Sequence, residues 1–248
     1  FIGIKLFQCM VVFLSSFLTF KTASRLNFKH AWIAALSVYA MPVYFKSQFS
    51  GLTEPLFSLF VIMAIWLEVS KKSKLALLTV SFMPFIRMEG LLIMLVFALY
   101  HIVSKREVMK LGFLCTGIVL YSIIGFFYYH DLIWFFTQNP YAQYESIYGS
   151  GSLMHFVKQL PFTIGYPVFF LLFVGVLKNL FFLFTPQTYC DDDKKRELFL
   201  VFGTFMIFFL FHAISWYMGL FGSFGMVRYF ICVVPVIGLL ALSGINIL

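Results

Sequence analysis

Residues 198–217 read LFLVFGTFMIFFLFHAISWY, a run without a single Asp, Glu, Lys or Arg. A helix of that length rises about 30 Å, which matches the thickness of the hydrocarbon core of a bilayer. Only 11% of the chain is charged, whereas a soluble domain carries about 25% charged residues. So little charge cannot cover a surface that faces water on all sides. We therefore predict a membrane protein.

Nine apolar runs of this kind extend along the chain, separated by short polar segments. They cover residues 1–20, 30–45, 54–69, 75–86, 90–103, 111–129, 161–184, 198–217 and 227–248. This pattern predicts an all-α fold, a polytopic transmembrane helix bundle of about nine membrane segments in a single domain over residues 1–248. The chain opens with Phe1 and lacks the features of a signal peptide. We expect a fragment of a longer membrane domain that lacks the N-terminal part.

Basic residues are unevenly divided between the two sides if the nine runs alternate and residue 1 lies outside. Thirteen of the 18 basic residues then fall on the inner side: Lys21, Arg25, Lys29, Lys71, Lys72, Lys74, Lys105, Arg106, Lys110, Lys178, Lys194, Lys195 and Arg196. The outer side keeps Lys5, Lys46, Arg87, Lys158 and Arg228. Cytoplasmic loops carry an excess of Lys and Arg, so this division supports the orientation. The same loops account for the net charge of +8, and we expect no nucleic-acid partner.

Residues 75–103 allow either one long helix or a short hairpin that turns near residues 87–89. A single helix would place the basic clusters at 71–74 and 105–110 on opposite sides of the membrane, whereas a hairpin keeps both inside. The hairpin is therefore our prediction. Its first arm, from Leu75 to Ile86, rises only about 18 Å. We expect its tip to lie below the outer surface.

Ionisable residues near the outer ends of the runs are the candidate functional residues, because charge at membrane depth is costly. Glu54 lies between Thr53 and Pro55 at the start of a run. The structural alternative is that Thr53 or Glu54 caps a helix whose first turn contains the proline. A polar substrate contact is the functional alternative for Glu54.

Arg87, Glu89, Arg228 and Tyr229 are the other candidates for a binding site on the outer side. Arg87 and Glu89 belong to one turn, which can aim both side chains inward; a neutral pair that merely closes the hairpin is the alternative. Arg228 and Tyr229 begin the last run, where an arginine beside an aromatic ring also suits the lipid interface. A phosphate is the best match for the arginines, because a guanidinium binds two of its oxygens at once.

The longest hydrophilic stretch, residues 130–160, is predicted to be an outer segment that lies at the membrane interface. Its aromatic residues support this: Trp134, Phe135, Phe136, Tyr141, Tyr144 and Tyr148. His130 and Asp131 are a weak candidate for an acid–base pair, since loop polarity also explains them. Asp191–Asp193 contains an Asp-x-Asp pattern, but the basic residues that follow indicate a solvated charge cluster.

No motif in the sequence identifies a nucleotide or metal cofactor. The sequence contains no Gly-rich phosphate loop, no HExxH and no GxSxG motif, and we assign no metal ligand. No cofactor is certain, and a divalent cation is the one candidate that we keep.

Several short motifs occur in an order that resembles a known family. The chain reads KTASRLNFKHAW at 21–32, PVYF at 42–45 and SGLTEPLF at 50–57, followed by FIRMEG at 85–90 and RYF at 228–230. It resembles the GT-C superfamily of polytopic glycosyltransferases, which includes the mannosyltransferases that depend on dolichyl- or polyprenyl-phosphate sugars. The likeness covers most of the chain, and the segment TEPLF carries the most weight.

The resemblance implies an inverting transfer of a mannose-like sugar from a polyprenyl-phosphate or dolichyl-phosphate donor to an acceptor on the outer or lumenal face. The partners would be the lipid bilayer and this donor, in a bacterial cytoplasmic membrane or in the endoplasmic reticulum membrane of a eukaryote. The family places its catalytic acidic residue in the first outer loop. That loop is expected upstream of Phe1, so the catalytic residue of this chain stays unknown.

Other classes of membrane protein compete with the enzyme. A transporter or flippase often shows paired broken helices, and only one interrupted hairpin, at 75–103, is visible in the sequence. A protein similar to an O-antigen polymerase, or a non-catalytic scaffold, suits the long outer segment 130–160 nearly as well. An acidic residue in a loop upstream of this chain would favour the enzyme.

Overall fold

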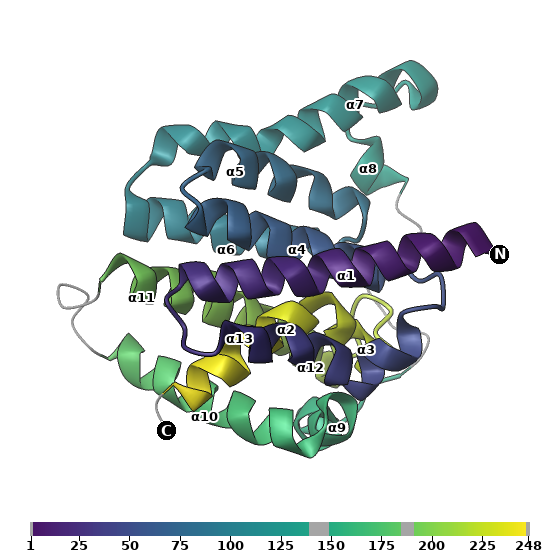
Figure 1. The fold of residues 1–248 in the computed structure, drawn as a ribbon. Coiled ribbons are helices and arrows are strands. Elements are labelled where there is room, and N and C mark those ends of the chain that lie inside the picture. Colours follow the sequence, from purple (N-terminus) through teal and green to yellow (C-terminus); the bar gives the residue numbers. More distant parts are fainter. Residues whose placement is uncertain (1, 139–148, 185–190, 247–248) are drawn as a thin grey trace.

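The computed structural model describes residues 2–138, 149–184 and 191–246. These residues form the all-α bundle drawn in Figure 1. The α-helices in the first half are α1 (Ile2–Arg25), α2 (Ala31–Ala40), α3 (Pro42–Ser47), α4 (Glu54–Val69), α5 (Ser73–Phe82), α6 (Gly90–Leu99), α7 (Thr116–Tyr129) and α8 (Trp134–Thr137). Those in the second half are α9 (His155–Ile164), α10 (Tyr166–Leu183), α11 (Asp192–Arg196), α12 (Gly203–Met218) and α13 (Val234–Ile245).

Tighter and wider helical turns join several of these helices. Met83–Phe85, Val108–Cys115 and Val227–Val233 are 3₁₀ segments, and Tyr100–Lys105 and Glu197–Phe202 are π-helical.

Five helical segments of the described residues are long and apolar enough to cross a bilayer, which indicates a multi-pass membrane protein. They are Ile2–Arg25, Val108–Tyr129, Tyr166–Leu183, Asp192–Met218 and Val227–Ile245. The prediction of nine spans is therefore only partly met, because the other runs form shorter helices. The run at 30–45, for example, divides at Met41, and Pro42 starts a new helix because proline cannot continue the hydrogen-bond ladder of α2.

The centre of the bundle is formed by α4 and α13, which bury most of their residues. Between α10 and α13 the two backbones come unusually close. A side-chain carbon added at Gly175 would lie 2.1 Å from the Leu240 carbonyl oxygen, and one at Gly244 would lie 2.4 Å from that of Leu171. Small residues permit this packing, which is typical of helices in membranes.

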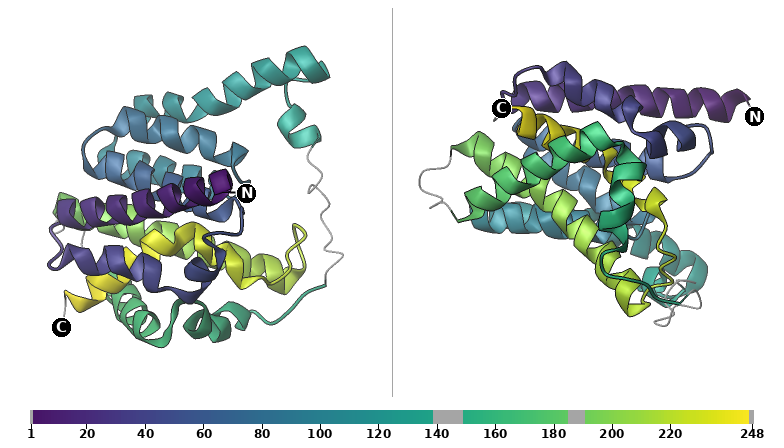
Figure 2. Two further views of the ribbon diagram at one scale, coloured as in Figure 1. Left: turned by 45° about the vertical axis from the view of Figure 1, so that its right-hand side comes forward. Right: turned by 90° about the horizontal axis from the view of Figure 1, so that it is seen from below.

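The predicted hairpin at 75–103 is present as α5 and α6, joined by the turn at 83–89. α5 packs against α4 on one side and α6 on another, α6 also contacts α12, and α7 lies beyond α5 (Figure 1). Figure 2 shows that α7 and α8 project beyond the rest of the bundle. Because Arg87 in the turn at 83–89 contacts Glu54, this turn lies at the same end of the bundle as the start of α4.

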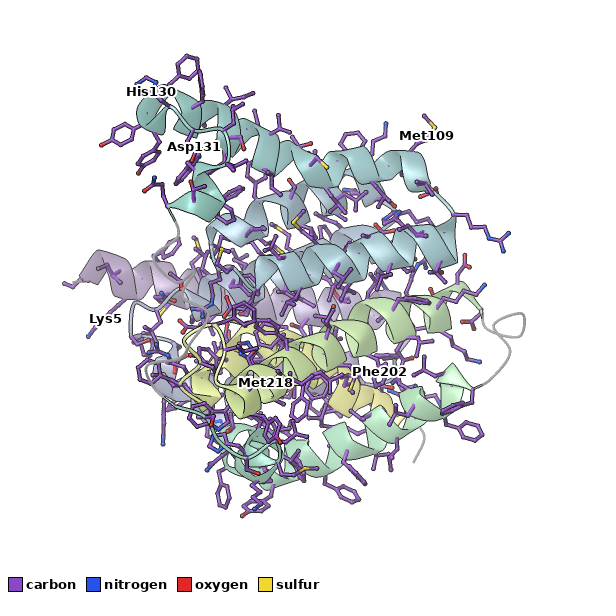
Figure 3. All side chains as sticks on the ribbon, turned by 180° about the vertical axis from the view of Figure 1, so that it is seen from behind. Lys5, Met109, His130, Asp131, Phe202 and Met218 are labelled. Carbon is purple, nitrogen blue, oxygen red and sulfur yellow. The ribbon has the colours of Figure 1, made fainter. Side chains whose placement is uncertain are left out.

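The two ends of the bundle carry different polar contacts. One end holds residues predicted to be inside: Asn27 bonds Asp193 at 2.7 Å, Lys178 pairs with Glu197 at 3.0 Å, and Lys110 pairs with Glu107 at 2.8 Å. In Figure 3, Met109 lies at this end, whereas Lys5, His130 and Met218 lie toward the other. The residues that the sequence assigned to one side thus lie together.

Cysteine labelling tests which end faces the cytoplasm. Met109, whose side chain is 97% exposed, marks the predicted inner end, and the exposed Ser150 marks the outer end. After replacement of the native cysteines, a membrane-impermeant maleimide added to intact cells should label Ser150→Cys and spare Met109→Cys. The opposite pattern would show that the orientation derived from the basic residues is inverted.

Candidate functional site

Glu54 is the buried centre of the candidate site, at the start of α4. Its side chain is only 2% exposed. Thr53, the residue before α4, makes no capping hydrogen bond with its side chain. The structure therefore does not contain the Thr53 cap that was the structural alternative. Pro55 occupies the first turn, where its missing N–H leaves no hydrogen bond unmade. The Glu54 carboxylate instead faces two arginines from distant parts of the chain.

Arg87 reaches Glu54 from the turn between α5 and α6. Its Nη1 lies 3.2 Å from Glu54 Oε1 and donates to Thr53 Oγ1 at 3.3 Å, while its Nη2 donates to Glu89 Oε1 at 2.8 Å. Arg87 and Glu89 could not meet in this way on a regular helix, because residues two apart face different directions. The turn aims both inward, as the sequence predicted.

Arg228 approaches the same carboxylate from the opposite side, at the start of Val227–Val233. Its Nε lies 3.5 Å from Glu54 Oε1, and its side chain is 45% exposed. Tyr229, the next residue, stacks its ring on His212 of α12. The structure therefore brings together all five residues that the sequence nominated, although they come from three separate segments.

One feature of the cluster favours a bound ligand over a closed structural ion pair. Glu54 Oε2 and Arg87 Nε are buried and have no hydrogen-bond partner among the described residues. Leaving such atoms unpaired typically costs about 1–3 kcal/mol each, and more for charged groups. Burial raises the pKa of the Glu89 carboxyl, but the Arg87 guanidinium outweighs burial and holds that pKa below its usual value. Glu89 therefore stays ionised at neutral pH and keeps Arg87 oriented.

Part of the predicted interfacial segment packs next to this site. The Gly151 N–H donates to the Trp216 carbonyl oxygen at 3.1 Å, and His155 Nε2 lies 2.9 Å from the Gly225 carbonyl oxygen. These contacts hold residues 151–155 against the end of α12 and the loop before Arg228. Tyr141, Tyr144 and Tyr148 lie outside the described residues.

The other charged candidates do not join the cluster. Asp131 accepts from the Ile133 N–H and from Thr137, and so shapes the turn into α8. His130 ends α7 in the left-handed conformation. Asp191 caps α11 by accepting from the Lys194 N–H at 2.7 Å, and Asp193 pairs with Arg196. Both acidic segments thus have local structural roles.

The sequence did not reveal several buried polar residues inside the apolar runs. His101 and Glu68 are fully buried, 3.3 Å apart, and Ser73 donates to Glu68 at 2.9 Å. The Glu197 carboxylate accepts hydrogen bonds from Lys178 and Ser243. Among the described residues no group of three or more His, Cys, Asp or Glu side chains is arranged to hold a metal ion, so a site for the divalent cation is not seen there.

Comparison with known proteins adds no family to this geometry. No protein-family model matches the chain, and neither a curated protein nor a solved structure matches it.

The cluster predicts an asymmetry in stability between its two arginines. Arg87→Ala would leave the buried Glu54 and Glu89 carboxylates without their partner, at a cost of about 3–5 kcal/mol. Arg228→Ala would remove a half-exposed pair, which is worth about 0–1 kcal/mol. In thermal unfolding of the purified chain in detergent, the midpoint temperature should therefore fall strongly for Arg87→Ala and only slightly for Arg228→Ala. Equal losses would contradict the central position of Arg87.

Proposed function

We propose that this chain is a membrane glycosyltransferase, which transfers a mannose-like sugar from a polyprenyl-phosphate donor to an acceptor on the outer or lumenal face. The observation that carries the proposal is the pair of arginines bridged by the buried Glu54 at one end of the bundle. The motifs that resemble the GT-C glycosyltransferases contain these same residues.

In this proposal Arg228 makes the principal contact with the donor phosphate. Its ion pair with Glu54 uses Nε, and no other ion pair within the described residues holds its two terminal nitrogens. Such a half-exposed guanidinium can donate hydrogen bonds to two phosphate oxygens at once. Arg87 is held more firmly by Glu54 and Glu89, and its unpaired Nε offers one further donor.

The arginines would act on the charge that develops as the donor is cleaved. In an inverting transfer, the acceptor hydroxyl attacks C1 of the sugar, its proton passes to a carboxylate, and the C1–O bond to phosphate breaks. The departing polyprenyl phosphate gains one negative charge. Donors placed where charge develops stabilise the transition state more than the ground state. This gives the two arginines a role in catalysis as well as in binding.

An apolar groove that reaches Ile86, the residue before Arg87, suits the lipid part of such a donor. The groove has a volume of about 520 Å³ and lies between α4 and α5. Its lining extends from Leu67 near the end of α4 and Leu75 near the start of α5 to Ile86. In this proposal a prenyl chain occupies the groove with its phosphate toward Arg87.

A transporter or flippase is the second candidate, because two helices contain π-helical turns. Tyr100–Lys105 ends the helix that begins as α6, and Glu197–Phe202 lies between α11 and α12. The rings of Tyr100 and Phe199, one from each segment, lie 6.0 Å apart. π-Helical turns are frequent at functional sites. Proteoliposomes separate the two functions: an enzyme transfers sugar from a donor supplied outside, whereas a flippase moves the intact lipid without transfer.

Substitution of Arg228 tests the phosphate contact. Arg228→Lys keeps the charge but loses the two-pronged geometry, so we expect affinity for a prenyl phosphate to fall at least about tenfold, or about 1.4 kcal/mol. Thermal stability should stay nearly unchanged. Binding would be measured by fluorescence titration of the chain in nanodiscs of neutral phosphatidylcholine.

A matched pair of variants separates this contact from a general effect of charge. Arg228→Gln and Lys158→Gln each remove one positive charge from the outer side, and both side chains are exposed. Only Arg228→Gln should weaken binding. If Arg228→Lys binds as the wild type does, or both glutamine variants lose affinity equally, a phosphate contact at Arg228 is wrong.

A further inference from the structure

His212 is a buried polar residue for which packing alone gives no reason. It lies on α12 with 5% of its surface exposed. Aromatic rings surround it: its ring centroid is 4.6 Å from that of Tyr229, with the planes 9° apart, and 4.6 Å from that of Phe208. Phe156 and Phe211 are also in contact range. Its Nε2 atom is buried and has no hydrogen-bond partner among the residues that the structure describes.

An unpaired buried nitrogen is unfavourable in such a place. Nearly all buried polar atoms in proteins have a hydrogen-bond partner, and each exception calls for an explanation. A phenylalanine would make similar stacking contacts with Tyr229 and Phe208 without this penalty. No residue that the structure describes supplies a partner for this nitrogen, which leaves it free to bind a ligand.

The position of His212 connects this missing partner with the arginine cluster. His212 interacts electrostatically with both Glu89 and Arg87, and Tyr229, which stacks on it, follows Arg228 in the chain. Glu54 Oε2 and Arg87 Nε are the two other unpaired buried atoms of the same cluster. The three unpaired atoms thus belong to segments that contact one another around the arginine cluster.

We propose that His212 is a further ligand-binding residue of this site, whose Nε2–H donates a hydrogen bond to a phosphate oxygen of the phosphorylated lipid. The inference rests on the proposed function and adds a third donor to the two arginines. Tyr229 acts through His212 as a positioning residue, because its stacked ring fixes the plane of the imidazole. A neutral imidazole suffices, since the contact needs only the N–H.

Replacement of His212 by phenylalanine separates a ligand contact from a packing role. His212→Phe keeps the aromatic stack and removes the nitrogen. With farnesyl phosphate as the probe, we expect at least about fivefold weaker binding, as for the loss of one hydrogen bond to a charged group. Thermal stability should be equal to the wild type or higher. Binding of farnesol, which has no phosphate, should not change.

Two further variants serve as controls. His212→Gln places an amide N–H near the position of Nε2 and should bind farnesyl phosphate more tightly than His212→Phe does. Phe208→Leu disturbs the same aromatic cluster without removing a polar atom, so it should lower stability and leave affinity unchanged. If the affinity for farnesyl phosphate falls in step with thermal stability across all three variants, the proposal is wrong.

A measurement on the wild type decides the matter even if His212→Phe fails to fold. The chain has 5 histidines, so its ¹⁵N-histidine spectrum is simple, and the His212 signals are assigned by their absence in His212→Gln. The Nε2 resonance should shift on addition of farnesyl phosphate but not of farnesol. An unchanged resonance overturns the role of His212, while weaker binding by Arg228→Lys would still support the proposed function. If the wild type binds both probes equally, both proposals fall.

Discussion

The buried carboxylate of Glu54 is the constraint around which one end of this bundle is organised. An ionised carboxylate that is almost fully buried must be paired, because its desolvation otherwise costs several kcal/mol. Arg87 and Arg228 supply this pairing from segments that lie 33 and 174 positions further along the chain (87 − 54 and 228 − 54). The start of α4, the α5–α6 turn and the segment before α13 are thereby held at one place.

The proposed function uses the incomplete pairing in this cluster. Two arginines and two glutamates, Glu54 and Glu89, balance one another in formal charge, which lowers the cost of burying them together. Within the described residues Glu54 Oε2 and Arg87 Nε have no partner, and Arg228 is half exposed. Buried ion pairs contribute little net stability compared with apolar packing. Recognition of a phosphate, as we propose, gives the cluster a role that stability alone does not.

The sequence predicted the helical class better than it predicted the number of long spans. Runs such as 198–217 are apolar on all sides, and backbone groups in lipid must pair internally, so helices were the only choice. The run at 30–45 failed as a span because Met41 and Pro42 divide it. The short lengths of α5 and α6 agree with the predicted hairpin.

Which residues pair with one another depends on packing that no local pattern encodes. Glu54, Arg87 and Arg228 were nominated because charge is rare on the outer side, but their common contact follows from how α4, α5 and α13 pack. Glu68 lies at the end of one apolar run and Glu197 directly before another. The sequence did not predict that they are buried beside His101 and Lys178. His212 gave no signal at all, because a single histidine in an aromatic run is most often a packed core residue.

An experimental structure of the chain with a bound prenyl phosphate tests the central claim most directly. The account predicts phosphate density at the outer end, within hydrogen-bond distance of the terminal nitrogens of Arg228 and of Arg87 Nε, with the prenyl chain entering the groove between α4 and α5. Phosphate bound elsewhere, with Glu54, Arg87 and Arg228 unchanged and empty of ligand, would show that the cluster is a structural ion pair and would contradict the account.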